Sequence, residues 1–160
     1  MSKRLLEIAE GPIPSRESLE QEFGFHFKLR DSVKDRKEGI GTYYGTANSP
    51  PFGAGVAGNP SNIHYSDFKS EIVIAFRFDS KRVGINKTTD RYCVEGEFIF
   101  KDLIGKWKKF QKEQGHYPIV VNYTATFLDV ERTVEVSPIY LSSETCINGF
   151  YVSYTTPNKV

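Results

Sequence analysis

Hydrophobic and polar residues alternate along several stretches of the chain, the period of a β-strand with one face in a core and the other in solvent. The first stretch is 23–29, where every second residue is Phe or Leu. Similar alternation recurs over 71–78, 92–100, 119–127, 133–141 and 150–154. We therefore expect about six strands, joined by polar turns into a mostly antiparallel sheet.

One segment shows the helical period instead. Over 102–114 a narrow apolar arc is surrounded by lysines; it consists of Leu103, Ile104, Trp107 and Phe110. Asp102 can cap the first turn, Gly115 can end the helix, and Pro118 prevents its continuation. The sequence predicts one principal amphipathic helix over about 102–114, packed on one face of the sheet.

Short helical segments are expected near the N-terminus, where Leu5, Leu6 and Ile8 form a small apolar patch before Gly11-Pro12. Ser18 and Gln21 have the spacing of a capping box for a brief second helix. Strands that flank a single principal helix are typical of an α+β fold. A chain of 160 residues suits a single domain over 1–160.

Residues 39–66 contain no Asp, Glu, Lys or Arg and are rich in Gly and Pro. This composition predicts a long loop without regular structure, either flexible or functional. Its aromatic residues are candidates for contact with a partner, because a solvated linker is usually less aromatic. They are Tyr43, Tyr44, Phe52 and Tyr65.

The overall charge balance gives the chain no general affinity for nucleic acid or membranes, because the formal net charge is only +1. No apolar run approaches the roughly 20 residues of a membrane helix. Glu7 and Glu10 interrupt the N-terminal apolar residues, so no secretory signal is expected. Cys93 and Cys146 are then expected to be buried thiols in a reducing, cytoplasmic (intracellular) location, with peripheral membrane association as a variant of it.

Motifs that carry chemistry are weak. Residues 53–58 match G-x-G-x-x-G, but prolines on both sides leave no room for the strand and helix that bind a dinucleotide. His26, His64 and His116 lack the spacing of a zinc site, and no nucleophile, base and orienting group can be assembled. The sequence therefore predicts no catalytic residues, no metal site and no cofactor, and it leans away from an enzyme.

The basic helix is the remaining candidate for a site on an anionic membrane surface or nucleic acid. Its lysines are Lys101, Lys106, Lys108, Lys109 and Lys112. A near-neutral monomer would need to self-associate to multiply such weak contacts. We therefore expect a non-enzymatic assembly or binding protein that forms homo-oligomers. Small viral matrix or other virion structural proteins offer an architectural analogy, without any motif in support.

Two alternatives stay open at this stage. The first is a ligand-binding or sequestering module, with residues 39–66 as a lid over the sheet. The second is a small enzyme whose site residues are dispersed in the sequence and meet only in the fold.

Overall fold

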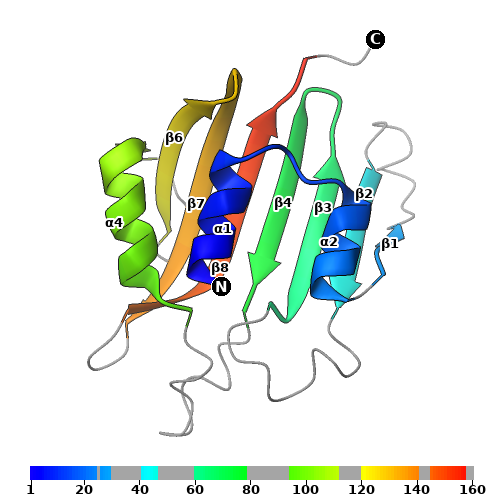
Figure 1. Ribbon diagram of the computed structural model, residues 1–160, viewed down its shortest axis with the longest axis horizontal. Helices are drawn as coiled ribbons and strands as arrows, with labels where there is room; N and C mark the ends of the chain where they lie inside the picture. The colour runs from blue at the N-terminus through cyan, green and yellow to red at the C-terminus, as the bar shows by residue number, and fades with distance from the viewer. Residues whose placement is uncertain are drawn as a thin grey trace, which may run out of the picture.

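The computed structural model describes residues 1–24, 26–29, 41–46, 60–78, 94–111, 120–140 and 145–157. Over these ranges the chain forms one antiparallel sheet with helices α1, α2 and α4 on one of its faces (Figure 1). The helices are α1 (Ser2–Glu10), α2 (Arg16–Phe23) and α4 (Gly96–Lys106). The predicted α+β fold, with helices packed on one face of the sheet, is confirmed.

The sheet has eight strands in the order β1-β2-β3-β4-β8-β7-β6-β5. They are β1 (Lys28–Leu29), β2 (Gly41–Thr46), β3 (Asn62–Asp67), β4 (Glu71–Arg77), β5 (Lys108–Phe110), β6 (Val121–Phe127), β7 (Val130–Tyr140) and β8 (Thr145–Thr155). The two edge strands, β1 and β5, have only two and three residues. The six longer strands match the expected number, but only β4, β6, β7 and β8 lie in segments that were predicted as strands.

The topology repeats one plan twice. Strands β1 to β4 follow α1 and α2 as a meander, and β5 to β8 follow α4 as a second meander. The last strands of the two meanders, β4 and β8, pair antiparallel and join both halves into one sheet.

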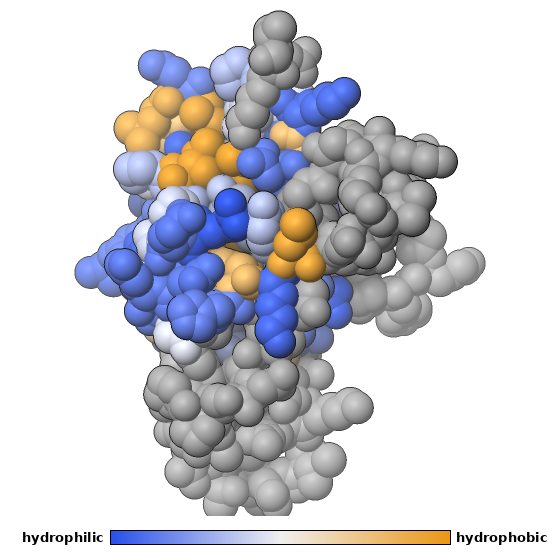
Figure 2. Space-filling model, turned by 90° about the vertical axis from the view of Figure 1, so that its right-hand side faces the viewer, coloured by the Kyte–Doolittle hydropathy of each residue, from blue (hydrophilic) through white to orange (hydrophobic). Residues whose placement is uncertain are grey.

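The core lies between the sheet and the helices because alternate residues of the central strands point to the helix side. Fully buried examples are Ile74 and Phe76 on β4, and Val152 on β8. The helices contribute a second layer of apolar side chains, which includes Leu5, Ile8, Leu19, Ile99 and Leu103. Seen from the side of β1, the described surface is largely hydrophilic, with hydrophobic residues gathered mainly in its upper part (Figure 2).

The principal helix differs in position from the predicted one. It starts six residues earlier, at Gly96, and ends at Lys106. Trp107 adopts an extended conformation, and Lys108–Phe110 then pair with β6 as strand β5. Trp107 and Phe110 follow Leu103 at helical spacing, but Trp107 is buried just beyond the helix end and Phe110 is half-buried on the edge strand β5. Ile104, expected on the apolar arc, is 71% exposed.

Other expected boundaries also shift. Phe23 ends helix α2, where Gly24 takes the left-handed conformation, so the strand expected over 23–29 shrinks to Lys28–Leu29. The cap of α2 is Ser15, whose side chain accepts from the backbone nitrogen of Ser18. Residues 96–100, expected within a strand, form the first part of α4. The alternation there does not distinguish a strand from a helix that buries Gly96, Ile99 and Leu103.

The uncharged segment 39–66 is not a loop throughout, because both of its ends are strands. Residues 41–46 form β2, and β3 takes up residues 62–66 before ending at Asp67. Ile63 and Tyr65 supply the buried positions of β3, and pairing between β2 and β3 overrides the low strand propensity of the glycines. Residues 47–59 of the expected loop lie outside the described residues. The expectation of two thiols is also wrong, because Cys146 is disulfide-bonded.

Candidate functional site

The face of the sheet opposite the helices is the side on which polar residues gather. Facing residues of antiparallel strands point to the same side, so the pairing register orders this face into rows. One row contains Phe110, Asn122, Glu135 and Tyr151, which are successive partners across β5, β6, β7 and β8. The next row contains Thr124, Thr133, Ser153 and Val73.

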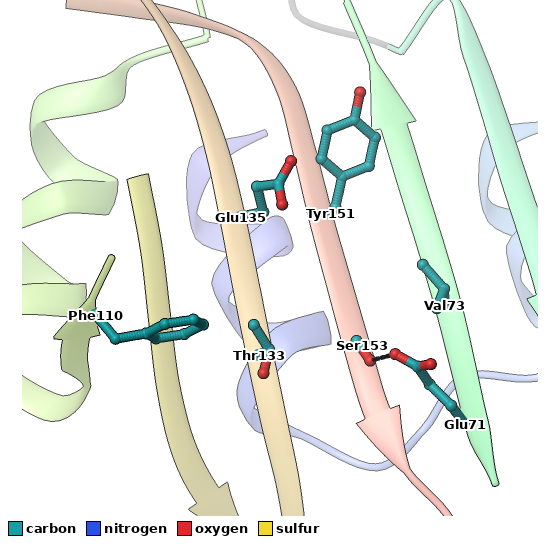
Figure 3. Close-up of a pocket in the computed structure, with 7 residues that line it drawn as sticks. All are labelled: Glu71, Val73, Phe110, Thr133, Glu135, Tyr151 and Ser153. Atoms are coloured by element: carbon teal, nitrogen blue, oxygen red, sulfur yellow. Dashed lines mark hydrogen bonds between the residues drawn. The ribbon is translucent and has the colours of Figure 1, made fainter. Parts of the chain in front are cut away.

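A groove of about 410 Å³ lies over residues of these two rows and Glu71. Seven residues from four strands line it: Glu71, Val73, Phe110, Thr133, Glu135, Tyr151 and Ser153. Figure 3 shows them on the open face, with the ring of Phe110 extending across β6 toward Thr133. Aromatic surface and polar groups therefore meet in one hollow, a combination typical of ligand sites.

The polar groups of the groove differ in how far the protein satisfies them. Ser153 donates its hydroxyl to the carboxylate of Glu71 on the neighbouring strand (Figure 3). Glu135 and Tyr151 face each other across β7 and β8. Within the described part of the chain, no hydrogen bond or ion pair engages the Glu135 carboxylate or the Tyr151 hydroxyl. These two groups are available to a ligand.

Asn122 adds a buried polar group beside the groove. It lies between Phe110 and Glu135 in the row, so its side chain points to the same face as these two lining residues. Its side chain is covered, with only 3% of the residue exposed. Its Oδ1 has no hydrogen-bond partner among the described residues. A buried acceptor without a donor destabilises a protein by about 1–3 kcal/mol, and a donor from a ligand would remove that cost.

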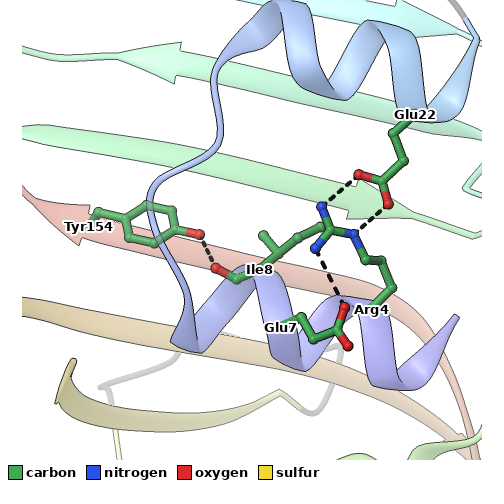
Figure 4. Close-up of polar contacts among 5 residues, drawn as sticks. All are labelled: Arg4, Glu7, Ile8, Glu22 and Tyr154. Carbon is green, nitrogen blue, oxygen red and sulfur yellow. Dashed lines mark hydrogen bonds and ion pairs between the residues drawn. The ribbon is translucent and has the colours of Figure 1, made fainter. Parts of the chain in front are cut away.

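On the helix side of the sheet, most of the polar groups bond within the protein, although Asp102 Oδ2 and Arg132 Nε have no hydrogen-bond partner among the described residues. The guanidinium of Arg4 on α1 pairs with Glu22 on α2 and with Glu7 one turn along its own helix (Figure 4). Tyr154 donates its hydroxyl to the carbonyl oxygen of Ile8 at 2.6 Å (Figure 4). These contacts fasten the helices to each other and to the sheet, so they are structural.

A carboxyl pair joins α1 to α4 on the helix side. Lys106 donates to Glu10 at 3.2 Å and to Asp102 at 2.8 Å, and the Trp107 indole donates to Glu10 at 3.2 Å. Burial raises the pKa of Glu10, and a hydrogen bond with Asp102 raises it further. Burial opposes ionisation of Asp102, but hydrogen bonds with Glu10 and Lys106 outweigh it and lower the pKa of Asp102.

The five lysines of the predicted anionic-surface site do not form one row on a helix. Lys101 is exposed on α4, and Lys106 is held by its two carboxylate partners. Lys108 and Lys109 are exposed on β5, where successive residues point to opposite faces. Lys112 lies outside the described residues. The structure therefore divides this set among a helix, an ion-pair cluster and a sheet edge.

The aromatic residues proposed for partner contact are not brought together at the groove. Tyr43 is half-buried, and the guanidinium carbon of Arg16 lies 3.6 Å from the centre of its ring. Tyr65 is buried on the helix side, where its hydroxyl lies 3.4 Å from the carbonyl oxygen of Pro14. The backbone of Tyr44 pairs with His64 within the sheet, and Phe52 lies outside the described residues.

Sequence reasoning missed the groove because its residues look like ordinary solvent-facing positions. Thr133 and Glu135 on β7, and Tyr151 and Ser153 on β8, alternate with core residues. The alternation identifies them as one face of the sheet. It does not reveal that β7 and β8 are neighbours, which only the topology establishes.

The described residues bring no group of three or more His, Cys, Asp or Glu side chains into an arrangement that could hold a metal ion. The helices in the described ranges are all too short or too polar to cross a membrane. Comparison with protein-family models, curated proteins and solved structures finds no match for this chain.

Proposed function

We propose that this protein is a non-enzymatic binding protein whose ligand occupies the groove on the open face of the sheet. One observation carries the proposal: helices α1, α2 and α4 cover one face, and the other face is hollowed at residues that include Glu135 and Tyr151, whose polar groups have no partner among the described residues. The lining contains acceptors, hydroxyls and two aromatic rings, which suit recognition. The described residues of the lining include no histidine or cysteine.

The architecture supports this use of the sheet. A rigid, many-stranded sheet holds its outward side chains at fixed spacings, so a ligand meets a preformed surface. The edges of the sheet offer a ligand or partner much less than this face does. Strands β1 and β5 have two and three residues, and β5 carries Lys108 and Lys109. Short, charged edge strands are features by which proteins avoid pairing with other sheets.

The disulfide at Cys146 is relevant to the compartment in which the protein works. Disulfides persist in oxidising compartments and are rare in the cytosol. This favours a secretory, periplasmic or extracellular setting for the binding function over the cytoplasmic one expected from the sequence.

A thermal-shift screen with a matched pair of variants tests the proposal. Thr133→Trp places a large ring inside the groove. Thr126→Trp is the control, because it places the same ring on the open face of the sheet, on β6, but outside the lining. A ligand of the groove raises the unfolding midpoint of the unmodified protein and of Thr126→Trp, because it binds the folded state only. It does not raise the midpoint of Thr133→Trp.

The unfolding midpoints without ligand verify that both variants fold. If every stabilising compound or peptide acts equally on Thr133→Trp and Thr126→Trp, the groove is not the binding site and the proposal fails.

A second proposal keeps the role expected from the basic residues. We propose as an alternative that the protein is an assembly protein, of the kind found in virions, which forms homo-oligomers and contacts an anionic membrane or nucleic acid. Its support is the exposure of Lys101, Lys108 and Lys109, none of which has an ion-pair partner among the described residues. Sedimentation with anionic vesicles or RNA over a salt series tests it. Binding that is equal for Lys101→Glu/Lys109→Glu and for the distant Lys69→Glu removes this alternative.

A further inference from the structure

We propose that the groove binds a basic side chain, arginine or lysine, carried on an extended segment of a partner protein. This inference rests on the proposed function and names the chemical class of its ligand. It follows from the charge of the lining, from its unpaired acceptors, from its aromatic rings and from its dimensions.

The charge of the lining is negative. Glu71 and Glu135 are the carboxyl groups among its described lining residues, which include no Lys, Arg or His. Lys108 and Arg77 share this face by register, but neither belongs to the lining. An anionic ligand would therefore meet two carboxylates without a compensating cation, whereas a cation would find opposite charge within the hollow.

Two acceptors in or beside the groove lack a donor, the Glu135 carboxylate and the Asn122 side-chain oxygen. The Asn122 Oδ1 is buried without a partner, and in the register its neighbour is Glu135, whose carboxylate can only accept. Ammonium and guanidinium groups can only donate. A guanidinium placed between Asn122 and Glu135 would satisfy both oxygens at once.

The aromatic rings of Phe110 and Tyr151 stand at the two ends of the same row. The face of an aromatic ring attracts a cation by about 0.5–2 kcal/mol, and arginine is the commoner partner. The aliphatic stem of a lysine or arginine can also pack against these rings while the charged end reaches the carboxylates. The aliphatic stem and the charged end of a basic side chain therefore both meet complementary groups in the groove.

The dimensions of the groove favour a protein segment over a small organic cation. Its lining residues lie on β5, β7, β8 and β4, and β6 lies between β5 and β7. At about 4.8 Å per strand, these five strands span roughly 19 Å. An extended segment of about six residues has that length. A free amine would occupy only one part of so open a surface.

Fluorescence anisotropy with labelled hexapeptides tests the inference. Hexa-arginine is the probe, hexa-citrulline is its neutral isostere, and hexa-glutamate is its opposite in charge. The variants are Glu135→Gln and Glu71→Gln in the groove, with Glu131→Gln as the control on the same strand and face but outside the lining. Thr133→Trp reports whether any binding depends on the groove. Circular dichroism checks that each variant keeps its fold.

We expect hexa-arginine to bind, citrulline to abolish the binding, and Glu135→Gln to weaken it about fivefold, the size of one half-exposed charge contact. Glu131→Gln should leave it unchanged. Equal weakening by Glu131→Gln and Glu135→Gln overturns the inference, because it indicates diffuse attraction to surface charge.

The outcomes also separate this inference from the proposed function. If hexa-citrulline or hexa-glutamate binds as tightly as hexa-arginine and Thr133→Trp abolishes that binding, the groove is a binding site but not for a cation. If no peptide binds in a way that Thr133→Trp disturbs, the inference fails, and the thermal-shift screen then decides the proposed function on other compounds.

Discussion

Arg132 on β7 donates from Nη1 to the carbonyl oxygen of Ala9 at the end of α1, at 2.8 Å and 123 positions apart in the sequence. The same guanidinium also donates to the carbonyl oxygens of Gly11 and Phe127. Arg132 is 1% exposed and has no carboxylate partner among the described residues. The carbonyl groups at the helix C-terminus, with their partial negative charge, take the place of a counterion. This contact fixes α1 on the sheet and closes the core.

Arg132→Met tests this anchor. The substitution keeps an unbranched side chain but leaves the carbonyl groups of Ala9, Gly11 and Phe127 buried without their donor. We expect the free energy of unfolding to fall by about 3 kcal/mol, measured by urea denaturation. The exposed Arg77→Met is the control, with an expected change below about 0.5 kcal/mol. Equal effects of the two substitutions would contradict the anchoring role.

Tyr154→Phe and Tyr151→Phe form a second matched pair on one strand. The Tyr154 hydroxyl donates to Ile8 in the core, so its loss leaves a buried carbonyl unsatisfied and should lower the free energy of unfolding by about 1–2 kcal/mol. The Tyr151 hydroxyl faces the open groove, so its loss should leave stability nearly unchanged. The reverse order of effects in thermal unfolding would show that the two faces of β8 are wrongly assigned.

The turn between β6 and β7 is a place where the protein can be stabilised. Leu128 and Asp129 have φ angles of 50° and 59°, a conformation that glycine adopts freely, that Asn and Asp tolerate, and that leucine adopts at a cost. Replacing the pair by Asn-Gly should raise the free energy of unfolding by about 1 kcal/mol. A lower midpoint in differential scanning calorimetry would contradict the left-handed turn.

Glu10→Gln tests the carboxyl pair between α1 and α4 through pH. The folded state raises the pKa of Glu10 above its ordinary value of 4.5, so folding favours the protonated form. The resulting stability is complete below pH 4.5 and is lost as pH rises through the raised pKa. Asp102, whose pKa is lowered, stays ionised between pH 4.5 and neutrality.

The unmodified protein should therefore gain stability relative to Glu10→Gln as pH falls from neutrality toward 4.5. Urea denaturation of both proteins at several pH values measures the difference. A difference that does not change with pH, or that shrinks as pH falls, would show that burial of the carboxyl pair does not favour protonated Glu10.

The sequence pattern predicted β4, β6, β7 and β8 and a helix layer on one face of the sheet, because burial on one face imposes a period of two. The same alternation over 23–29 and 92–100 did not produce strands of that length. The prediction failed where residues at the spacing of one kind of element belong to another kind. Trp107 and Phe110 continue the spacing of Leu103, yet Trp107 is extended at the end of α4 and Phe110 lies in strand β5. Gly41 and Gly45 suggested a loop, yet pairing with β3 makes their segment a strand.

The groove could not have been predicted, because its residues become neighbours only through the pairing of distant strands. Glu71 and Ser153 are 82 positions apart and form a hydrogen bond across β4 and β8. The lysines were visible as a cluster in sequence but not in space, since the helix that was expected to carry them ends at Lys106.

Hydroxyl-radical footprinting, with and without a ligand identified by the thermal-shift screen, tests the central claim most directly. Phe110 and Tyr151 report on the groove, and Phe98, 47% exposed on α4, reports on the helix side. Binding in the groove predicts that oxidation of Phe110 and Tyr151 falls while that of Phe98 is unchanged. Protection of Phe98 alone would contradict the claim and place the ligand on the helices.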